Sequence, residues 1–288
     1  MNQSAVKQVA FIGLGVMGYP MAGHLAAKGY QVTVFNRTQE KADQWMKQHG
    51  GKSAPTPAEA AAGAHAVFAC VGNDDDVREI TIGSDGAFHG MSDNAIFIDH
   101  TTASAEVARE LYDAAATRGL GFLDAPVSGG DTGARAGTLA IMVGGDRAVY
   151  ERAMPYFKIM GENIAYMGTA GAGQHTKMSN QILIASTMMG VVESLLYGYK
   201  AGLDREEIIA VIGKGAASCF AINNLGPRIV KGDFDPGFFI KHFVKDMGIA
   251  LAEAQAMRLS MPGLSLANQF YTAAMAEGLE DRGTQALY

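Results

Sequence analysis

A glycine-rich turn near the start of the chain constrains its fold more than any other feature. The run from Val9 to Ala22 reads as a short apolar strand, three glycines in a G-x-G-x-x-G spacing, and a helix of small residues. Gly13 permits a tight turn, Gly15 lets backbone approach a ligand, and Gly18 lets the helix pack closely on the strand. The first helical turn also offers N–H groups and partial positive charge, so the pattern is typical of a pyrophosphate-binding turn. The alternative is a glycine turn without a ligand.

Strand and helix patterns alternate through the first half of the chain. Apolar strand-like runs occur at residues 8–12, 31–35, 66–71, 95–99, 121–124, 138–143 and 163–167, with helical stretches at 38–49, 57–63, 104–118 and 146–157. This alternation predicts an α/β fold with a doubly wound, mostly parallel sheet that helices cover on both faces. Ligands of such sheets bind outside the carboxyl ends of the strands. We therefore expect a site in the segments 13–18, 36–38, 72–76, 100–103 and 125–130.

The second half of the chain has helical periodicity only. One helical pattern runs from Gly173 to about Ala201, and further helices are expected near 204–214, 219–230, 239–258 and 263–277. At ~1.5 Å per residue the first of them spans roughly 40 Å, enough to leave one domain and enter another. We therefore expect a nucleotide-binding domain over residues 1–167 and an all-helical domain over residues 168–288, joined by one long helix.

The composition excludes several classes of protein. The net charge of −6 and the lack of a Lys/Arg-rich block argue against a nucleic-acid partner. The polar N-terminus, with Asn2, Gln3 and Ser4, does not resemble a secretory signal, and no run of about 18 apolar residues predicts a membrane span. The two cysteines, Cys70 and Cys219, are expected to be buried free thiols, which fits a reducing cytoplasm.

The end of the second expected strand bears on the choice of dinucleotide. NAD-specific sites place an Asp or Glu about 20 residues after the glycines to bind the ribose 2′-hydroxyl. This chain has Asn36 at that place and Arg37 after it, and Arg can pair with a 2′-phosphate that an acidic residue would repel. We therefore expect NADP to be preferred and NAD to be possible. The alternative is that Arg37 is a solvated turn residue and that Thr38 only caps the next helix.

Two further segments could bind and convert a small acid. Ser128, Gly129 and Gly130 follow a strand and can turn successive backbone N–H groups toward a carboxylate, with an ordinary glycine turn as an equal alternative. Lys177 and Asn180 are three residues apart on the long helix and share one face. A lysine with a lowered pKa could exchange a proton there, but most helical lysines are only solvated.

Two charged runs are open to more than one interpretation. Lys245 and Asp246 lie in an apolar helix and could face a site or form a charged surface stripe. The run Asn-Asp-Asp-Asp at residues 73–76 could suggest a metal cluster. Consecutive acids before a helix are more typical of a cap, and no spaced set of His, Asp and Glu accompanies them. We therefore expect no metal.

Four segments occur in an order that resembles the β-hydroxyacid dehydrogenase family. They are the glycine turn, the run from Asp124 to Gly130, the helix start from Gly171 to Asn180, and the run from Lys241 to Ala250. The family includes 3-hydroxyisobutyrate dehydrogenase and tartronate semialdehyde reductase, and it is distantly similar to 6-phosphogluconate dehydrogenase. The resemblance covers nearly the whole chain and implies an N-terminal Rossmann domain and a helical domain for substrate binding and dimerisation.

The resemblance also implies a role for each site residue. Lys177 is implied to be the catalytic acid or base, Asn180 to orient the substrate, and Ser128, Gly129, Gly130 and Asp246 to bind it. Cofactor contacts are expected at Gly13, Leu14, Gly15, Val16, Met17, Gly18, Asn36, Arg37, Thr38, Val71, Asn73, Thr102 and Lys245.

The implied reaction is hydride transfer between a nicotinamide dinucleotide and a small β-hydroxy acid or its semialdehyde. The residues around Lys177 look more like tartronate semialdehyde reductase than 3-hydroxyisobutyrate dehydrogenase, and the chain also resembles a bacterial branch whose substrate can differ from both. An imine reductase and a non-catalytic dinucleotide-sensing module are the alternatives, and the presence of Lys177 weighs against each. Members of the family are usually dimers or tetramers, so we expect a homo-oligomer.

Overall fold

The computed structural model describes residues 7–288 of the chain. Asn2, Gln3 and Ser4, on which the expectation of no signal segment depends, lie outside the described residues. The chain forms two compact units, the first ending at Lys177 and the second running from Met178 to Tyr288. Each unit is described by itself. The first unit extends ten residues beyond the expected domain boundary at 167, because backbone N–H groups near residue 171 bind a carboxylate of the sheet.

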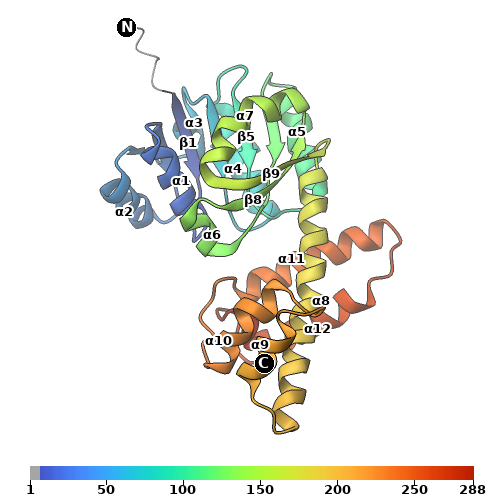
Figure 1. Ribbon diagram of the computed structural model, residues 1–288. Helices are drawn as coiled ribbons and strands as arrows, with labels where there is room; N and C mark the ends of the chain where they lie inside the picture. Colours follow the sequence, from blue (N-terminus) through green and yellow to red (C-terminus); the bar gives the residue numbers. More distant parts are fainter. Residues whose placement is uncertain (1–6) are drawn as a thin grey trace. The chain divides into compact units, whose positions relative to one another are not determined.

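The first unit is built on a mostly parallel sheet, as expected (Figure 1). Its strands are β1 (Gln8–Ile12), β2 (Gln31–Phe35), β3 (Lys52–Ser53), β4 (Ala66–Ala69), β5 (Ile96–Asp99), β6 (Gly121–Asp124), β7 (Val127–Ser128), β8 (Leu139–Gly145) and β9 (Gly161–Gly168). Their order is β3-β2-β1-β4-β5-β6-β8-β7, with β9 paired to β8. The pairings from β3 to β6 are parallel, whereas β8 runs antiparallel to β6 and β7.

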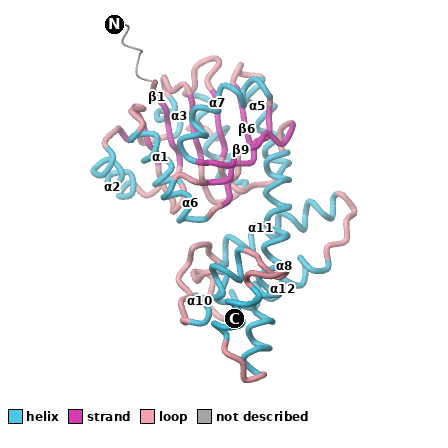
Figure 2. Tube along the Cα trace, in the orientation of Figure 1, coloured by secondary structure: helices cyan, strands magenta, loops and turns pink. Residues whose placement is uncertain are grey.

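Helices cover both faces of this sheet (Figures 1 and 2). They are α1 (Gly18–Ala27), α2 (Gln39–His49), α3 (Pro57–Ala61), α4 (Asp74–Ile82), η1 (Ala87–His89), α5 (Ala105–Ala116), α6 (Gly130–Ala136) and α7 (Arg147–Met160). Side chains of β1 alternate between two cores, with Val9 and Phe11 in one and Ala10 and Ile12 in the other. Burial of each large apolar side chain stabilises the fold by roughly 1.5–3 kcal/mol. The doubly wound α/β fold is therefore confirmed.

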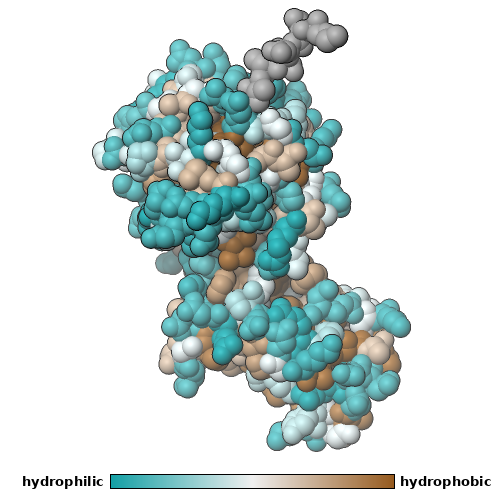
Figure 3. Space-filling view, turned by 90° about the vertical axis from the view of Figure 1, so that its left-hand side faces the viewer, coloured by the Kyte–Doolittle hydropathy of each residue, from teal (hydrophilic) through white to brown (hydrophobic). Residues whose placement is uncertain are grey.

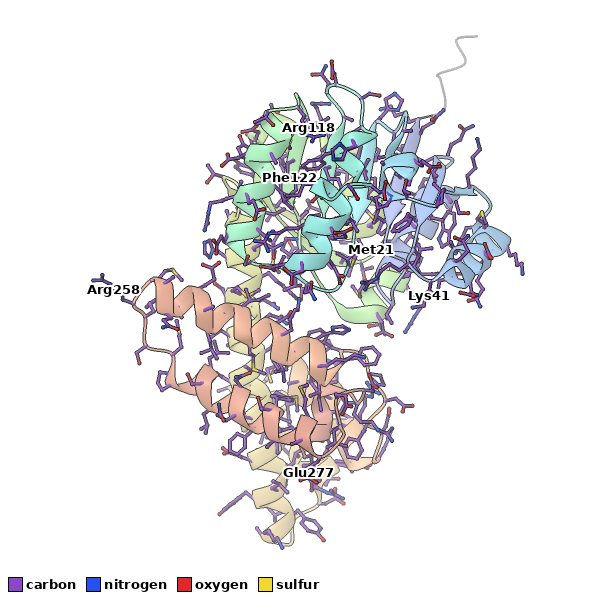
Figure 4. The ribbon with its side chains drawn as sticks, turned by 180° about the vertical axis from the view of Figure 1, so that it is seen from behind. Met21, Lys41, Arg118, Phe122, Arg258 and Glu277 are labelled. Atoms are coloured by element: carbon purple, nitrogen blue, oxygen red, sulfur yellow. The ribbon has the colours of Figure 1, made fainter. Side chains whose placement is uncertain are left out.

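Aromatic and aliphatic side chains fill both cores, and many of them are completely buried. Met21 on α1 and Phe122 on β6 are almost inaccessible to solvent, and Figure 4 shows both within the first unit. Phe97 and Phe122 stack across neighbouring strands with ring centroids 6.0 Å apart. These contacts hold β5 and β6 in register, and the two strands end beside each other at Asp99 and Asp124.

Polar caps set the starts of several helices. Thr56 accepts the N–H of Glu59 through its hydroxyl ahead of Pro57, and Asn73 accepts the N–H of Asp76 at 2.9 Å. Each cap satisfies one N–H that the first helical turn leaves without a partner. The acidic run at residues 73–76 is thus the capped first turn of α4, as its spacing indicated.

The second unit is helical, as expected. It contains most of α8 (Ala172–Lys200), together with α9 (Arg205–Ile212), the π-helix η2 (Ala221–Leu225), α10 (Gly226–Val230), α11 (Ile240–Ala256), α12 (Pro262–Ala276) and η3 (Thr284–Leu287). Among the described residues its only β-pairing is the isolated bridge between Phe239 and Gly283. The single helix expected at 219–230 is instead η2 followed by α10, which starts at a Gly-Pro pair.

By length and composition alone, α8 could cross a membrane, with a hydropathy of 1.4 in its most apolar window. It is the one helix within residues 7–288 with this property. Met188 and Leu195 of this helix are completely buried in the core of the second unit, with Phe243 and Tyr271. This packing accounts for part of the apolar character of α8, and one helix that passes by length and composition alone is weak evidence for a membrane.

Candidate active site

The glycine turn after β1 has the geometry that its spacing predicts. Gly13 has a φ of +93°, and a Cβ added there would collide with the carbonyl oxygen of Cys70. A Cβ at Gly18 would collide with the carbonyl oxygen of Gly13 and crowd the Phe11 ring. At Gly15, by contrast, no atom lies within 4 Å of the Cβ position. Two glycines are therefore required by packing, while the third leaves open space beside the first turn of α1, as the approach of a pyrophosphate would require.

Asn36 ties the glycine turn to the end of β2. Its Oδ1 accepts the N–H of Leu14 at 2.9 Å, and its Nδ2 donates to the carbonyl oxygen of Thr38 at 2.9 Å. Both ends of the amide are used, which fixes its orientation. Thr38 is the N-cap residue of α2, but its side chain makes no capping hydrogen bond.

Arg37 is exposed beside this turn and pairs with an acid of the next segment. Its side chain is 81% exposed, and its Nη1 lies 2.9 Å from Oδ1 of Asp76. The other oxygen of Asp76 accepts the N–H of Gly72 at 3.1 Å. Arg37 therefore combines the exposure of a solvated residue with a defined position near the carboxyl ends of β2 and β4.

The segments after β4 and β5 are bound to each other. Val71 donates its N–H to the hydroxyl of Thr101 at 3.0 Å, and a Cβ at Gly13 would also crowd the Val71 side chain. Thr101 precedes Thr102, one of the expected cofactor contacts. The structure thus brings the glycine turn, Val71 and the loop that carries Thr102 to one edge of the sheet.

Asp124 anchors the start of α8 to the end of β6. Its two carboxylate oxygens accept the N–H groups of Gly171 and Gln174, each at 2.9 Å. A Cβ on Gly173 would collide with backbone oxygens of Met142 and Asp124, so this close approach requires glycine. Burial raises the pKa of the Asp124 carboxyl to about 6, while these N–H groups oppose the rise. A carboxylate at a helix N-terminus is also favoured by the helix dipole.

Gln174 extends this anchor to the loop after β5. Its Nε2 donates to the carbonyl oxygen of Thr101 at 2.8 Å, and its Oε1 accepts the N–H of Ala103 at 3.1 Å. Because Lys177 follows one turn later on the same helix, its backbone position is fixed relative to that loop. The Lys177 side chain is only 7% exposed, which is unusual for a lysine.

Two more titratable groups are buried at the carboxyl end of β5, and neither was predicted from the sequence. Burial raises the pKa of the Asp99 carboxyl to about 7, with a further contribution from the neighbouring charge of Asp124. Burial lowers the pKa of His100 to about 4, and its Nδ1 lies 2.7 Å from the carbonyl oxygen of Ala125. His100 is therefore neutral near pH 7.

The segment after β6 has a backbone suited to an anion. Gly129 and Gly130 have φ values of +130° and +64°, which side-chain-bearing residues rarely adopt. Ser128 belongs to the short strand β7, which pairs with β8 and holds the segment in place. Successive N–H groups in such a turn can form a small anion-binding concavity.

In the second unit, Asn180, Gln181, Lys245 and Asp246 form one polar cluster. Gln181 Nε2 donates to Oδ2 of Asp246 at 2.7 Å, and Asn180 Nδ2 donates to Oε1 of Gln181 at 2.7 Å. Lys245 Nζ lies 3.0 Å from the other oxygen of Asp246. Asp246 is 2% exposed, so the interpretation of a charged surface stripe is wrong for this residue. Gln181 was not among the residues predicted from the sequence, although it lies four residues after Lys177 and shares a face of α8 with it.

No group of three His, Cys, Asp or Glu that could hold a metal ion occurs within residues 7–288. A cavity of about 510 Å³ lies at the amino ends of β4 and β5, lined in part by Lys7, His65, Asn94 and Arg152. This is the edge of the sheet opposite the glycine turn. The cavity contains none of the expected site residues, and we assign the site to the carboxyl edge.

The parallel sheet, the glycine turn and the segments gathered at its carboxyl edge define the class of a dinucleotide-dependent oxidoreductase. Residues 8–168 match the family model of the NAD binding domain of 6-phosphogluconate dehydrogenase. Residues 171–288 match the model described as NAD-binding of NADP-dependent 3-hydroxyisobutyrate dehydrogenase. The chain belongs to the β-hydroxyacid dehydrogenase family and is an NAD(P)-dependent dehydrogenase.

Individual relatives agree with this assignment over nearly their whole length. The chain is 48% identical to an uncharacterised oxidoreductase of Bacillus subtilis, with 98% of each chain covered. It is 37% identical to 3-hydroxyisobutyrate dehydrogenase of Pseudomonas aeruginosa, covering 98% of this chain and 99% of that protein. A solved structure of Mycobacterium tuberculosis 3-hydroxyisobutyrate dehydrogenase with L-serine is 32% identical, with a TM-score of 0.89 and 98% of each chain covered.

Proposed function

We propose that this protein transfers a hydride between NADP(H) and the β-hydroxyl carbon of a small β-hydroxy acid, or the corresponding semialdehyde, with Lys177 as the general acid or base. The observation that carries the proposal is the burial of Lys177 on a helix whose start is anchored by Asp124 at the carboxyl end of β6. Burial on an anchored helix holds the amine in one place, as a group that exchanges a proton with a bound substrate requires. The relatives named as 3-hydroxyisobutyrate dehydrogenases support the substrate class.

Each site residue has one task in this mechanism. The backbone N–H groups of Ser128, Gly129 and Gly130 bind the carboxylate of the substrate. Lys177 accepts the proton of the alcohol during oxidation and returns it to the carbonyl oxygen during reduction. Asn180 holds the reacting oxygen in line, and positioning of this kind contributes much of the rate. The dinucleotide, when bound, supplies the hydride chemistry.

The preference for NADP rests on the corner after β2. Asn36 is neutral where an NAD-specific site has an acid, and Arg37 offers an exposed guanidinium for bidentate pairing with a 2′-phosphate. The model that matches residues 171–288 is described for an NADP-dependent enzyme, which agrees with this preference. The proposed cofactor contacts comprise residues 13–18 and 36–38 with Val71, Asn73, Thr102 and Lys245.

We also propose that the protein is a cytoplasmic homodimer or homotetramer, with the dinucleotide bound by residues 1–167 and self-association through residues 168–288. Large apolar side chains are exposed on the second unit, and Figure 3 shows hydrophobic areas on the face that it draws. Among them are Leu183, Tyr197, Val211, Phe220, Leu266 and Phe270. Exposed apolar area of this kind marks interaction surfaces, and the mass of the protein in solution tests the association.

Initial rates of dinucleotide oxidation and reduction with a panel of substrates test the proposed activity. The panel contains 3-hydroxyisobutyrate, L-serine, tartronate semialdehyde, succinic semialdehyde and their redox partners, each with NADP(H) and with NAD(H). We expect turnover of at least one short β-hydroxy acid or semialdehyde. Dinucleotide binding without turnover on the whole panel would favour a sensing module, and turnover of cyclic imines alone would favour an imine reductase.

The Lys177→Ala variant tests the mechanism. We expect the variant to fold and to bind the dinucleotide, but to lose turnover by at least ~10², the usual contribution of a general acid or base. Turnover close to that of the wild type would refute the role of Lys177. Lys200→Ala, at an exposed lysine of the same helix, is the matched control.

A further inference from the structure

We propose that Gln181 is a positioning residue that fixes the amide of Asn180 through hydrogen bonds that start at the Asp246 carboxylate. The inference rests on the proposed function, in which Asn180 orients the reacting oxygen. The three side chains form a continuous chain of two bonds, from Asn180 Nδ2 to Gln181 Oε1 and from Gln181 Nε2 to Asp246 Oδ2, each 2.7 Å long. We call this chain the amide relay.

The direction of the amide relay is set by the chemistry of Asp246. An ionised carboxylate can only accept hydrogen bonds, so Gln181 must turn its Nε2 toward it. That leaves only the Oε1 of Gln181 for Asn180, which must therefore donate. The Oδ1 of Asn180 is then the end of the amide turned away from Gln181. Each of the two amides alone could adopt either orientation, and the negative charge at the end of the relay selects one.

Burial makes this selection strong. Gln181 is 1% exposed and Asp246 is 2% exposed, so water does not compete for their polar atoms. Hydrogen bonds are stronger in such surroundings, and a mispaired amide would leave buried polar groups unsatisfied. The remaining oxygen of Asp246 faces the ammonium of Lys245 at 3.0 Å. The carboxylate is thus held between a cation and the relay.

The amide relay has a consequence for turnover rather than for cofactor binding. A fixed Asn180 presents one carbonyl oxygen and one remaining N–H in constant places. A flipped amide exchanges acceptor and donor, so the reacting oxygen meets the wrong partner. An error of this kind reduces kcat and kcat/KM together, because the interaction matters in the transition state. The affinity for NADP(H), measured separately, should not change.

A double-mutant cycle tests the relay. Gln181→Glu places a carboxylate opposite Asp246, and this carboxylate cannot donate a hydrogen bond to it. We expect the variant to lower kcat about 10-fold or more, because a hydrogen bond to a charged group is lost. In the Asp246→Asn background, the new amide at position 246 can donate to the new carboxylate at position 181. That carboxylate can still accept a hydrogen bond from Asn180. We therefore expect the same Gln181→Glu change to cost less than about threefold there. The readouts are kcat, KM and the NADPH dissociation constant by fluorescence.

Equal losses in the two backgrounds would overturn the proposal, because Gln181 would then act independently of Asp246. Gln255→Glu, the same chemical change at an exposed position of α11, is the control and should leave kcat unchanged. If Gln181→Glu does not fold, Gln181→Met removes both hydrogen bonds without adding charge. Full kcat in a folded Gln181→Met protein would also refute the relay.

The stability of the same four proteins separates this inference from the proposed function. Thermal unfolding without substrate measures the coupling between positions 181 and 246 directly. A wild-type chain that turns over nothing in the panel would refute the proposed function and, with it, the catalytic use of the relay. Coupling in stability without coupling in kcat would show that the hydrogen bonds exist but have only a structural role, which would overturn the positioning proposal.

Discussion

In the proposed function, the exposed residue Arg37 influences the choice of cofactor. Within residues 7–288, its guanidinium pairs with the Asp76 carboxylate at 2.9 Å. An exposed ion pair of this kind contributes at most about 1 kcal/mol to stability. The pairing is therefore easily exchanged, and a 2′-phosphate with two negative charges can compete for the same guanidinium.

We expect Arg37→Ala to weaken NADP(H) binding about 10-fold, the equivalent of roughly 1.4 kcal/mol for one charged hydrogen bond. Affinity for NAD(H) should stay within about twofold, because NAD(H) lacks the phosphate that the guanidinium binds. Fluorescence titration with both reduced dinucleotides measures the two constants. Equal weakening of both would show that Arg37 does not recognise the 2′-phosphate.

Single residues also mark where sequence reasoning succeeds and fails. The packing roles of Gly13 and Gly18 followed from spacing, because they depend on the backbone geometry of the turn. Gln181 was missed, since its partner Asp246 is 65 residues away and a helical glutamine carries no local sign of such a partner. Asp99 and His100 were missed for a related reason, because their pKa shifts come from burial by strands and helices distant in the sequence.

At the scale of elements, the glycine turn joins β1 to α1 through two contacts that exclude any side chain. A Cβ at Gly13 or Gly18 would overlap backbone atoms of other residues, whereas a Cβ at Gly15 would have no atom within 4 Å. Packing of the helix on the strand and access for a ligand are therefore assigned to different glycines of one turn. Substitutions at these positions should separate folding from binding.

We expect Gly15→Ala to keep the thermal stability of the wild type and to lose dinucleotide affinity by at least about 10-fold, because its methyl group occupies the path of the pyrophosphate. Gly18→Ala should be strongly destabilised, since its Cβ meets backbone that cannot move aside. Thermal unfolding and dinucleotide titration distinguish the two effects. Gly190→Ala, where no atom lies within 4 Å, is the control. Unchanged dinucleotide affinity in Gly15→Ala would contradict the assigned role.

Most elements were predictable because their apolar runs have a clear period. The strands β1, β2 and β6 match the expected bounds, and α8 differs by about one residue at each end. The strands β3 (Lys52–Ser53) and β7 (Val127–Ser128) were missed, because two residues are too few to show alternation. The π-helix η2 was expected to be an α-helix, because the pattern of apolar residues does not distinguish these two kinds of helix over so short a segment.

At the scale of the whole molecule, buried ionisable groups make the stability of the fold depend on pH. Asp99 and Asp124 have pKa values raised from 3.8 to about 7 and about 6, so the folded chain binds their protons more tightly than the unfolded chain. Their contribution to stability therefore falls as pH rises from about 4 to 7. His100, with a pKa lowered from 6.5 to about 4, acts oppositely, and its contribution is lost as pH falls through that window.

We expect Asp99→Asn to remove the larger of the two carboxyl contributions. The amide oxygen can still accept the N–H of Thr101, which lies 2.9 Å from the Asp99 carboxylate, so the local structure should be kept. The unfolding free energy of the variant, relative to the wild type, should then increase steadily between pH 4 and pH 7. Denaturant unfolding at several pH values measures this difference. An equal pH dependence in Asp93→Asn, at an exposed acid, would contradict the prediction.

The two bonds of Asn36 leave open a short evolutionary route to the other cofactor. A carboxylate at this position could still accept the N–H of Leu14, but its second oxygen would have to turn away from the carbonyl oxygen of Thr38, to which Asn36 donates. A single amino-acid replacement could thus introduce the negative charge that favours an unphosphorylated ribose while the bond to Leu14 is kept. If NADP(H) is the cofactor, as proposed, one replacement at this corner would shift the preference toward NAD(H) without rebuilding the fold around it.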